Sequence, residues 1–210
     1  MDDSLALFRA CFAACPLVAI IRGVRPDEAE AIGEAIFDSG IRIIEVPLNS
    51  PQPLESIRRL AAAFGDRALI GAGTVLQPGQ VAEVAAAGGR IIVAPNTNVA
   101  VIRATVAAGL VSSPGFFTPS EAFAALAAGA NLLKLFPAEA ASPDMVRAQR
   151  AVLPGEVPLV VVGGVRPGTM AAWREAGADG FGLGSALYRP GQGPDEVGAQ
   201  ARSFVRALAP

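Results

Sequence analysis

The fold is decided by a short unit that first appears at residues 17–40, with the sequence LVAIIRGVRPDEAEAIGEAIFDSG. It begins with an unbroken apolar run at 17–21, which is typical of a strand buried on both faces. Pro26 suits the first turn of a helix, so we expect a helix from 26 to 39 that ends at Gly40. A strand, a helix and a closing glycine thus form one structural unit.

The same unit recurs along the rest of the chain. Further strands are expected at 42–46, 68–71, 90–94, 110–113, 131–135, 158–162 and 179–183. The helices that follow them are expected at 51–64, 78–87, 99–108, 119–128, 143–152, 167–176 and 194–208. Alternation of this kind predicts a parallel sheet with helices outside it.

Eight such units favour a closed (β/α)8 barrel, the TIM barrel, and 210 residues lie near the compact end of its size range. A doubly wound open sheet is the alternative, although no Gly-x-Gly-x-x-Gly follows the first strand. A short amphipathic helix at 2–15 is expected before the barrel, because Leu5, Phe8 and Phe12 recur at helical spacing. We therefore expect one barrel domain over residues 1–210.

The composition is that of a folded globular protein, with 52% hydrophobic and 17% charged residues. The net charge is −2 and no block of like charges occurs, so nothing indicates binding to nucleic acid or to an anionic membrane. The apolar runs are too short for a transmembrane helix, and the opening Met-Asp-Asp lacks the basic segment of a signal peptide. These features predict a cytoplasmic protein.

The absence of histidine and the small number of cysteines limit which metal sites and catalytic mechanisms are possible. Histidine is absent, and Cys11 and Cys15 are the two cysteines. Mechanisms of the Ser-His-Asp or Cys-His kind and a histidine-ligated zinc aldolase are therefore excluded. We expect no metal and no cofactor, so acid–base chemistry must come from carboxylates, Lys, Tyr, Cys or the substrate.

A lysine lies inside the apolar run at 131–137, NLLKLFP. Burial disfavours the charged amine and lowers its pKa, and a neutral lysine can form a Schiff base with a carbonyl. The ordinary alternative is that the stem of Lys134 follows apolar surface while its amine reaches water. Glu45 has a similar setting, IIEVP at 43–47. The two groups could form a buried salt bridge or an acid–base pair.

In a barrel of this kind the active site lies at the C-terminal ends of the strands. Polar residues are expected there at Arg22, Glu45, Asn49, Thr74, Asn96, Ser113 and Lys134. The pairs Gly163-Gly164 and Gly184-Ser185 follow the last two strands, where barrels bind phosphate through backbone N–H groups. Residues 186–188 are a candidate for the short extra helix of such sites. The alternative is that the glycines merely end their strands.

Seven motifs, in order, resemble the 2-keto-3-deoxy-6-phospho-sugar-acid (KDPG/KDPGal) aldolases, a class I aldolase family on the (β/α)8 fold. The resemblance runs from about residue 16 to residue 208. The motifs are AIIRG at 19–23, IEVPLNSP at 44–51, GAGTV at 71–75, APN at 94–96, SPG at 113–115, LKLFPA at 133–138 and VGGV at 162–165.

The resemblance implies roles for individual residues. It implies that Lys134 forms the Schiff base and that Glu45 carries the proton. The substrate pocket would include Arg22, Thr74 and Pro95, with Thr74 binding the pyruvate carboxylate. The phosphate would be held by Gly163, Gly164, Gly184 and Ser185. The family is typically homotrimeric and needs no metal.

Two departures from the gluconate type of this family concern the substrate. That type usually has Glu-Val-Thr-Leu-Arg-Thr where this chain has EVPLNS at 45–50, so Asn49 cannot supply the arginine's charge. It also has threonine at the position of Val162. Both changes resemble the galactonate type, which splits 2-dehydro-3-deoxy-6-phosphogalactonate into pyruvate and D-glyceraldehyde 3-phosphate. The alternative is activity on the gluconate epimer, or on both C4 epimers.

Two other functions stay open at this point. One is a phosphate-binding barrel enzyme, such as an isomerase or epimerase, that does not use a Schiff base. The other is a non-catalytic sugar-phosphate binding protein. Lys134 and Glu45 both stand at their motif positions, which argues against the second.

Overall fold

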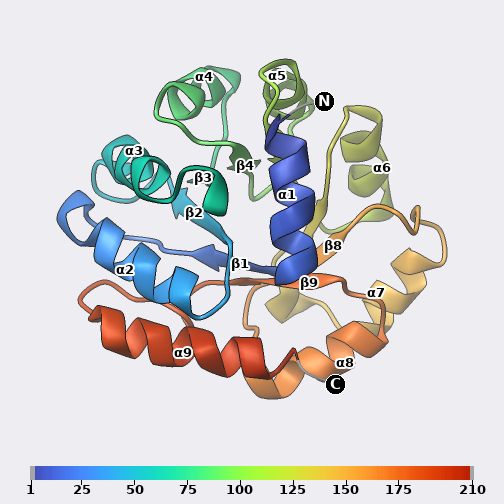
Figure 1. Cartoon of the computed structure of the whole chain (residues 1–210). Helices are drawn as coiled ribbons and strands as arrows, with labels where there is room; N and C mark the ends of the chain where they lie inside the picture. Colours follow the sequence, from blue (N-terminus) through green and yellow to red (C-terminus); the bar gives the residue numbers. More distant parts are fainter. Residues whose placement is uncertain (1–2, 209–210) are drawn as a thin grey trace.

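The computed structural model describes residues 3–208 and contains one parallel sheet rolled into a barrel, with helices around it (Figure 1). The order of strands in the sheet is β5-β4-β3-β2-β1-β9-β8-β7-β6. β5 (Val111–Ser113) pairs with β4, and β6 (Gly115–Phe116) pairs with β7. Only Pro114 separates β5 from β6, so the two ends of the sheet meet in one continuous stretch of chain. The (β/α)8 prediction is confirmed, and the open sheet is wrong.

The remaining strands are β1 (Leu17–Ile20), β2 (Ile43–Pro47), β3 (Leu69–Gly73), β4 (Ile91–Val93), β7 (Leu133–Leu135), β8 (Leu159–Val162) and β9 (Gly180–Leu183). The α-helices are α1 (Asp3–Ala14), α2 (Pro26–Asp38), α3 (Pro53–Phe64), α4 (Pro78–Ala86), α5 (Val99–Ala107), α6 (Pro119–Ala127), α7 (Pro143–Arg150), α8 (Met170–Glu175) and α9 (Pro194–Arg206). Short 3-10 turns occur at η1 (Gly65–Arg67), η2 (Ala138–Ala140) and η3 (Pro167–Thr169).

Local chemistry explains where the helices begin. α2 starts with Pro26, whose fixed φ suits the first helical position. α6 starts at a capping box, in which the Thr118 hydroxyl and the Glu121 carboxylate satisfy each other's backbone N–H groups. Asn98 caps α5 through the N–H groups of Ala100 and Val101. Each of these three helices starts within six residues of the preceding strand end, so the loops at that end of the barrel are short.

Alternate residues of each strand build two apolar layers. Outward-facing side chains such as Leu17, Ala19 and Ile44 belong to a core between the sheet and the helices. Inward-facing side chains form a second core inside the barrel, made of Val18, Ile20, Ile43, Leu69, Ile91, Val93, Val111, Leu132, Val160 and Val162. Among residues 3–208, the buried carboxylate and amine of the barrel interior, Glu45 and Lys134, lie near the C-terminal ends of their strands.

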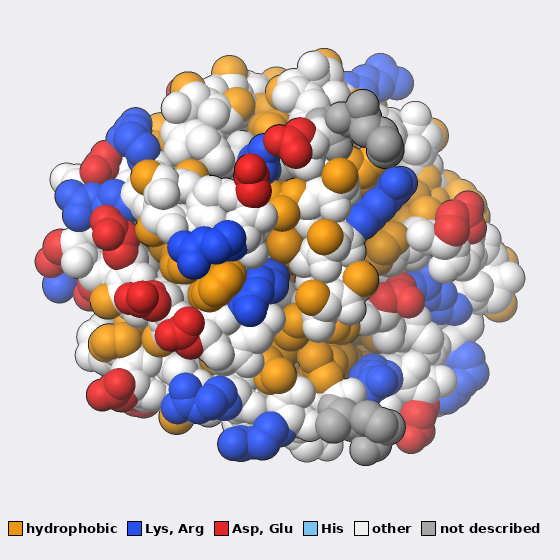
Figure 2. Space-filling view, in the orientation of Figure 1, with side chains coloured by type: hydrophobic (Ala, Val, Ile, Leu, Met, Phe, Trp, Pro, Cys, Tyr) orange, Lys and Arg blue, Asp and Glu red, His pale blue; other side chains and the backbone are white. Residues whose placement is uncertain are grey.

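Helix α1 covers the N-terminal end of the barrel. Its Phe8 and Cys11 join the inner core, and the helix lies across the strands in Figure 1. Figure 2 shows this face, on which acidic and basic side chains alternate and neither sign gathers into a broad patch. Within residues 3–208, no helix combines the length and apolar character that a bilayer crossing requires.

Four expectations need correction. Residues 186–188 form a turn and not a helix, because the N–H groups of Leu187 and Tyr188 both bond to Gly184 O and the chain then leaves the helical path. The fifth strand continues beyond residue 113 to Phe116, with Pro114 as a break. The helix expected at 51–64 begins two residues later, at Pro53. The helix expected at 167–176 begins as the turn η3, and residue 2 of the first expected helix lies outside the described residues.

Candidate active site

A cavity of about 590 Å³ opens at the C-terminal ends of the strands. All ten residues that the sequence predicted for the site line it: Arg22, Glu45, Thr74, Pro95, Lys134, Val162, Gly163, Gly164, Gly184 and Ser185. They come from seven different strand ends, which only the closed barrel brings to one place. Asn96 and Ser113, two other polar residues at strand ends, do not line it.

Lys134 and Glu45 lie at the floor of the cavity. They belong to different strands, and both side chains point into the barrel. Lys134 on β7 pairs with Gly115 and Val160, and Glu45 on β2 pairs with Ile20 and Gly71. Lys134 is 7% exposed and Glu45 is 2% exposed. Glu45 Oε2 has no hydrogen-bond partner among the described residues, so this buried oxygen is left to face the cavity. Lys134 is also the only lysine in the sequence.

Burial shifts the pKa of both groups in the direction that favours their neutral forms. Burial raises the pKa of Glu45 to about 7, although the positive charges of Lys134 and Arg22 oppose that rise. Burial lowers the pKa of Lys134; Glu45 opposes that change and Arg22 adds to it. A proton can therefore move on or off Glu45 near neutral pH, as general acid–base chemistry requires, and burial favours the neutral amine of Lys134. The site favours this use of the pair over a permanent buried salt bridge.

The end of β3 is shaped around Glu45. A Cβ built on Gly73 would lie 1.8 Å from Glu45 Oε2, so only glycine leaves room for the carboxyl group. The next residue, Thr74, has a φ of 57°, which lies in the left-handed region that residues other than glycine rarely adopt. Non-glycine residues are held in such conformations mostly at functional sites. The strained backbone places Thr74 at the cavity wall beside Glu45.

Val162 forms an apolar part of the wall. Its Cγ2 lies 2.6 Å from the place a Cβ would take on Gly182, and Ile20 packs on the same side. The valine side chain therefore fills the space that the missing Cβ of Gly182 leaves inside the barrel. It offers no hydrogen bond to a ligand.

The rim of the cavity presents unpaired backbone donors. Gly163 and Gly164 have φ values of 115° and 63°, which orient successive N–H groups in a way that L-residues rarely adopt. The N–H groups of Gly163, Gly164, Gly184 and Ser185 donate to no partner among the described residues. Concave sets of free N–H groups of this kind bind anions.

Several lining residues were missed by the sequence analysis: Ile20, Phe136, Glu139, Arg166, Tyr188, Arg189 and Pro190. Arg166 and Arg189 follow the two glycine-bearing turns by a few residues, and that closeness is the signal that could have found them. Among residues 3–208 neither guanidinium forms an ion pair. Asn49 does not line the cavity; its side chain accepts a hydrogen bond from Arg22.

Residues 9–193 match the family described as KDPG and KHG aldolase. The 2-dehydro-3-deoxy-6-phosphogalactonate aldolase of Escherichia coli K12 is 50% identical over 192 residues, 91% of this chain and 94% of that protein. A 2-dehydro-3-deoxy-phosphogluconate aldolase of Dickeya dadantii is 34% identical over 125 residues, 60% of this chain and 58% of that protein.

A solved structure described as native KDPGal is similar across nearly the whole barrel. It superposes with a TM-score of 0.91 at 49% identity, and the match covers 92% of this chain and 94% of that one. The sequence motifs, the barrel with its residues at the strand ends and these comparisons agree. The chain belongs to the KDPG and KHG aldolase family.

Proposed function

We propose that the protein is a class I aldolase that cleaves 2-dehydro-3-deoxy-6-phosphogalactonate to pyruvate and D-glyceraldehyde 3-phosphate. The observation that carries this proposal is the buried pair Lys134 and Glu45 on the floor of a cavity with free N–H groups at its rim. The membership of the chain in an aldolase family supports it. A cleavage assay on the galactonate and gluconate substrates side by side tests it, with the galactonate epimer expected to be preferred.

In this mechanism the neutral amine of Lys134 attacks the C2 carbonyl, and loss of water gives the Schiff base. Glu45 takes the proton of the C4 hydroxyl as the C3–C4 bond breaks. The bonding electrons pass into the iminium group, which becomes an enamine, and C4 becomes the aldehyde carbon. Glu45 then returns a proton to C3, and water releases pyruvate and free Lys134.

The ends of the substrate match the two chemical halves of the cavity. Thr74 and Arg22 lie near the reacting pair and would bind the carboxylate of the pyruvyl part. At the rim, the N–H groups of Gly163, Gly164, Gly184 and Ser185 would bind the phosphate. Arg166 and Arg189 would add positive charge there, because a phosphate dianion binds guanidinium groups strongly.

The preference for the galactonate epimer rests on Val162 and Asn49. The apolar Val162 wall has no hydrogen bond to give to the C4 hydroxyl, and Asn49 holds Arg22 in place of a second arginine. Higher identity to the galactonate aldolase of E. coli than to the gluconate aldolase of D. dadantii supports the same choice. Cleavage of the gluconate epimer in addition is the alternative that the paired assay decides.

An isomerase, an epimerase or a binding protein would leave Lys134 without a covalent role. Among described residues, the family's motif lysine and glutamate are both buried at the cavity floor, which favours an aldolase over these functions. Borohydride reduction in the presence of pyruvate separates the aldolase from all three.

The assembly, location and cofactor needs are part of the proposal. We place the enzyme in the cytoplasm, where its two free buried cysteines are stable as thiols. It acts without a metal or cofactor, so activity should survive prolonged chelation. We propose a homotrimer, and the exposed apolar side chains of Leu76, Val106 and Phe123 are candidates for its interface. Light scattering on a Phe123→Glu variant, which should dissociate a trimer that uses this surface, tests it.

A further inference from the structure

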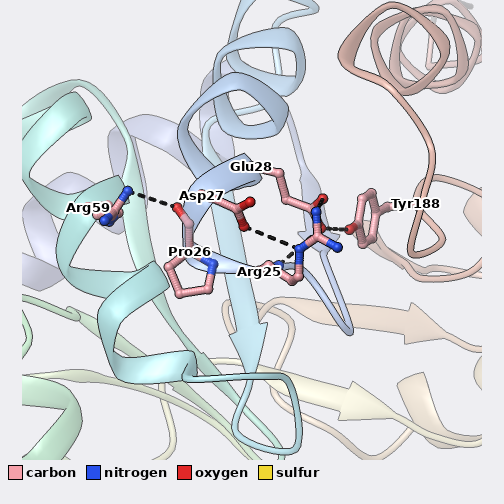
Figure 3. A network of polar contacts seen from close by, with 6 residues as sticks. All are labelled: Arg25, Pro26, Asp27, Glu28, Arg59 and Tyr188. Carbon is pink, nitrogen blue, oxygen red and sulfur yellow. Dashed lines mark hydrogen bonds and ion pairs between the residues drawn. The ribbon is translucent and has the colours of Figure 1, made fainter.

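Tyr188 presents its ring to the cavity and its hydroxyl to another part of the molecule. The side chain is 2% exposed, and its hydroxyl donates to Glu28 Oε1 at 2.9 Å (Figure 3). Glu28 belongs to the first turn of α2, whereas Tyr188 lies in the loop after β9. This hydrogen bond therefore joins the start of one helix to the loop that carries Gly184 and Ser185.

Glu28 is a fixed acceptor. Its Oε1 also accepts the backbone N–H of Arg25 at 3.0 Å, and its Oε2 lies 3.4 Å from Arg25 Nη2. Arg25 is held in turn by Asp27 at 3.2 Å, and Arg59 of α3 donates to Pro26 O at 3.3 Å (Figure 3). The carboxylate that receives the Tyr188 hydroxyl is thus anchored by the cap of α2.

The backbone of Tyr188 is tied to the rim of the cavity. Its N–H donates to Gly184 O at 3.0 Å, so the tyrosine and the rim residue Gly184 close the same turn. Further along the loop, Pro190 packs on Gly23, where a Cβ would lie 2.6 Å from Pro190 Cγ. The loop at 184–190 is therefore fastened to the segment at 23–28 at two points, and that segment directly follows Arg22.

We propose that Tyr188 is a positioning residue: its bond to Glu28 holds the turn at Gly184 and Ser185 in the conformation that binds the phosphate of the substrate. The proposal rests on the proposed function, because it assigns the phosphate to that turn. The hydroxyl is bound to Glu28 on α2, so it does not deliver a proton to the reacting carbons. Burial and Glu28 raise the pKa of Tyr188, which keeps the hydroxyl a donor throughout the neutral range.

The test is Tyr188→Phe, which keeps the ring and removes the hydroxyl. We expect the KM for the phosphorylated substrate to rise about 10-fold while kcat stays within about 2-fold of wild type. Trapping of pyruvate on Lys134 by borohydride should be unchanged, because pyruvate has no phosphate. Glu28→Gln retains an acceptor and should keep most of the affinity. Glu30→Gln, an exposed residue of the same helix, is the matched control and should behave as wild type.

Binding of inorganic phosphate, measured by calorimetry, gives a readout that does not depend on cleavage. The Kd of wild type should weaken about 10-fold in Tyr188→Phe. If wild type binds phosphate in this way but cleaves neither epimer, the proposed function fails and the positioning role stands. If wild type cleaves substrate and the KM of the variant stays within about 2-fold, the positioning role is wrong. An equal loss of pyruvate trapping also overturns it, because the substitution would then have damaged the whole barrel.

Discussion

Gly73 and the carboxyl group of Glu45 share one small space, since a Cβ on Gly73 would lie 1.8 Å from Glu45 Oε2. Gly73→Ala must therefore push the carboxyl group away from its place beside Lys134. Displacement of a reacting group by about 1 Å can cost about 100-fold in rate, and we expect a loss of kcat of that order. Steady-state assays with a circular dichroism check of folding would measure it.

Gly79→Ala is the matched control for this substitution. Gly79 lies in α4, where an added Cβ meets no atom within 4 Å. It should leave kcat unchanged and raise the free energy of unfolding by roughly 0.4–1 kcal/mol, because alanine reduces the freedom of the unfolded chain. Wild-type activity in Gly73→Ala would show that Glu45 does not act from the position seen here.

Lys134 should carry the covalent intermediate. Incubation with pyruvate and borohydride should add the mass of one reduced pyruvyl group to the peptide that contains Lys134. Since no other lysine exists in the chain, the α-amino group is the only competing primary amine. Lys134→Ala should lose nearly all aldol cleavage and the adduct while its thermal unfolding stays cooperative. A stable adduct confined to the N-terminal peptide would contradict the assignment.

The pH dependence of cleavage should follow Glu45. Its pKa is raised to about 7, so the carboxylate needed to take the C4 hydroxyl proton is lost as the pH falls through about 7. We expect kcat/KM to decrease on that acid side, and protonation of Lys134 acts in the same direction. The Glu45→Gln variant should have a much lower kcat/KM. The part of the acid-side decrease that comes from protonation of Glu45 should be absent from its pH profile. A wild-type rate that stays constant down to pH 5 would exclude this role.

Arg166 should bind the phosphate and contribute little to the chemical step. Arg166→Ala should raise the KM for phosphorylated substrate about 10-fold or more, as expected for a lost charge-assisted hydrogen bond, with little change in kcat. Its effect should shrink at high salt. Arg103→Ala, an exposed arginine on α5, serves as the control. If the unphosphorylated analogue loses as much affinity, Arg166 acts on the fold and not on the phosphate.

The choice between C4 epimers should depend on Val162 and Asn49. Wild type should favour the galactonate epimer by a modest margin, on the order of 10–100-fold in kcat/KM, because an apolar wall rejects hydroxyl variants weakly. Val162→Thr combined with Asn49→Arg should shift the ratio towards the gluconate epimer. A wild type that prefers the gluconate epimer would overturn the subfamily assignment and leave the aldolase mechanism in place.

Much of the fold could be predicted because each strand corresponds to a short apolar run and most helices begin at a proline. The parallel order of the strands then predicts that Glu45 and Lys134 lie at the same end of the barrel. Pro114 was harder, because a proline between two short strands reads as an end of the strand. In the barrel it only marks the change of partner from β4 to β7.

The parts of the site that were missed depend on contacts between distant segments. Arg166 and Tyr188 line the cavity because of the shapes of the loops after β8 and β9. No local sequence pattern specifies those loop shapes. The left-handed conformation of Thr74 could not be predicted from the sequence either, because threonine does not favour it and tertiary contacts must impose it. The fit of Gly73 to Glu45 depends on the curvature of the barrel, which brings the inward-facing positions of β2 and β3 close together. A sequence pattern does not specify that distance.

Helix α1 and the inner core beneath Lys134 fill the barrel at its N-terminal end, and the cavity opens at the C-terminal ends of the strands. Reactants and products must pass through the same opening, past the glycine turns at the rim. In the proposed mechanism, pyruvate is still bonded to Lys134 at the cavity floor after the C3–C4 bond breaks, whereas the aldehyde is free. Under that mechanism we expect ordered product release, with glyceraldehyde 3-phosphate departing first and pyruvate last. Accumulated pyruvate therefore competes with the sugar acid for the empty enzyme, whereas accumulated aldehyde reverses the reaction from the enamine.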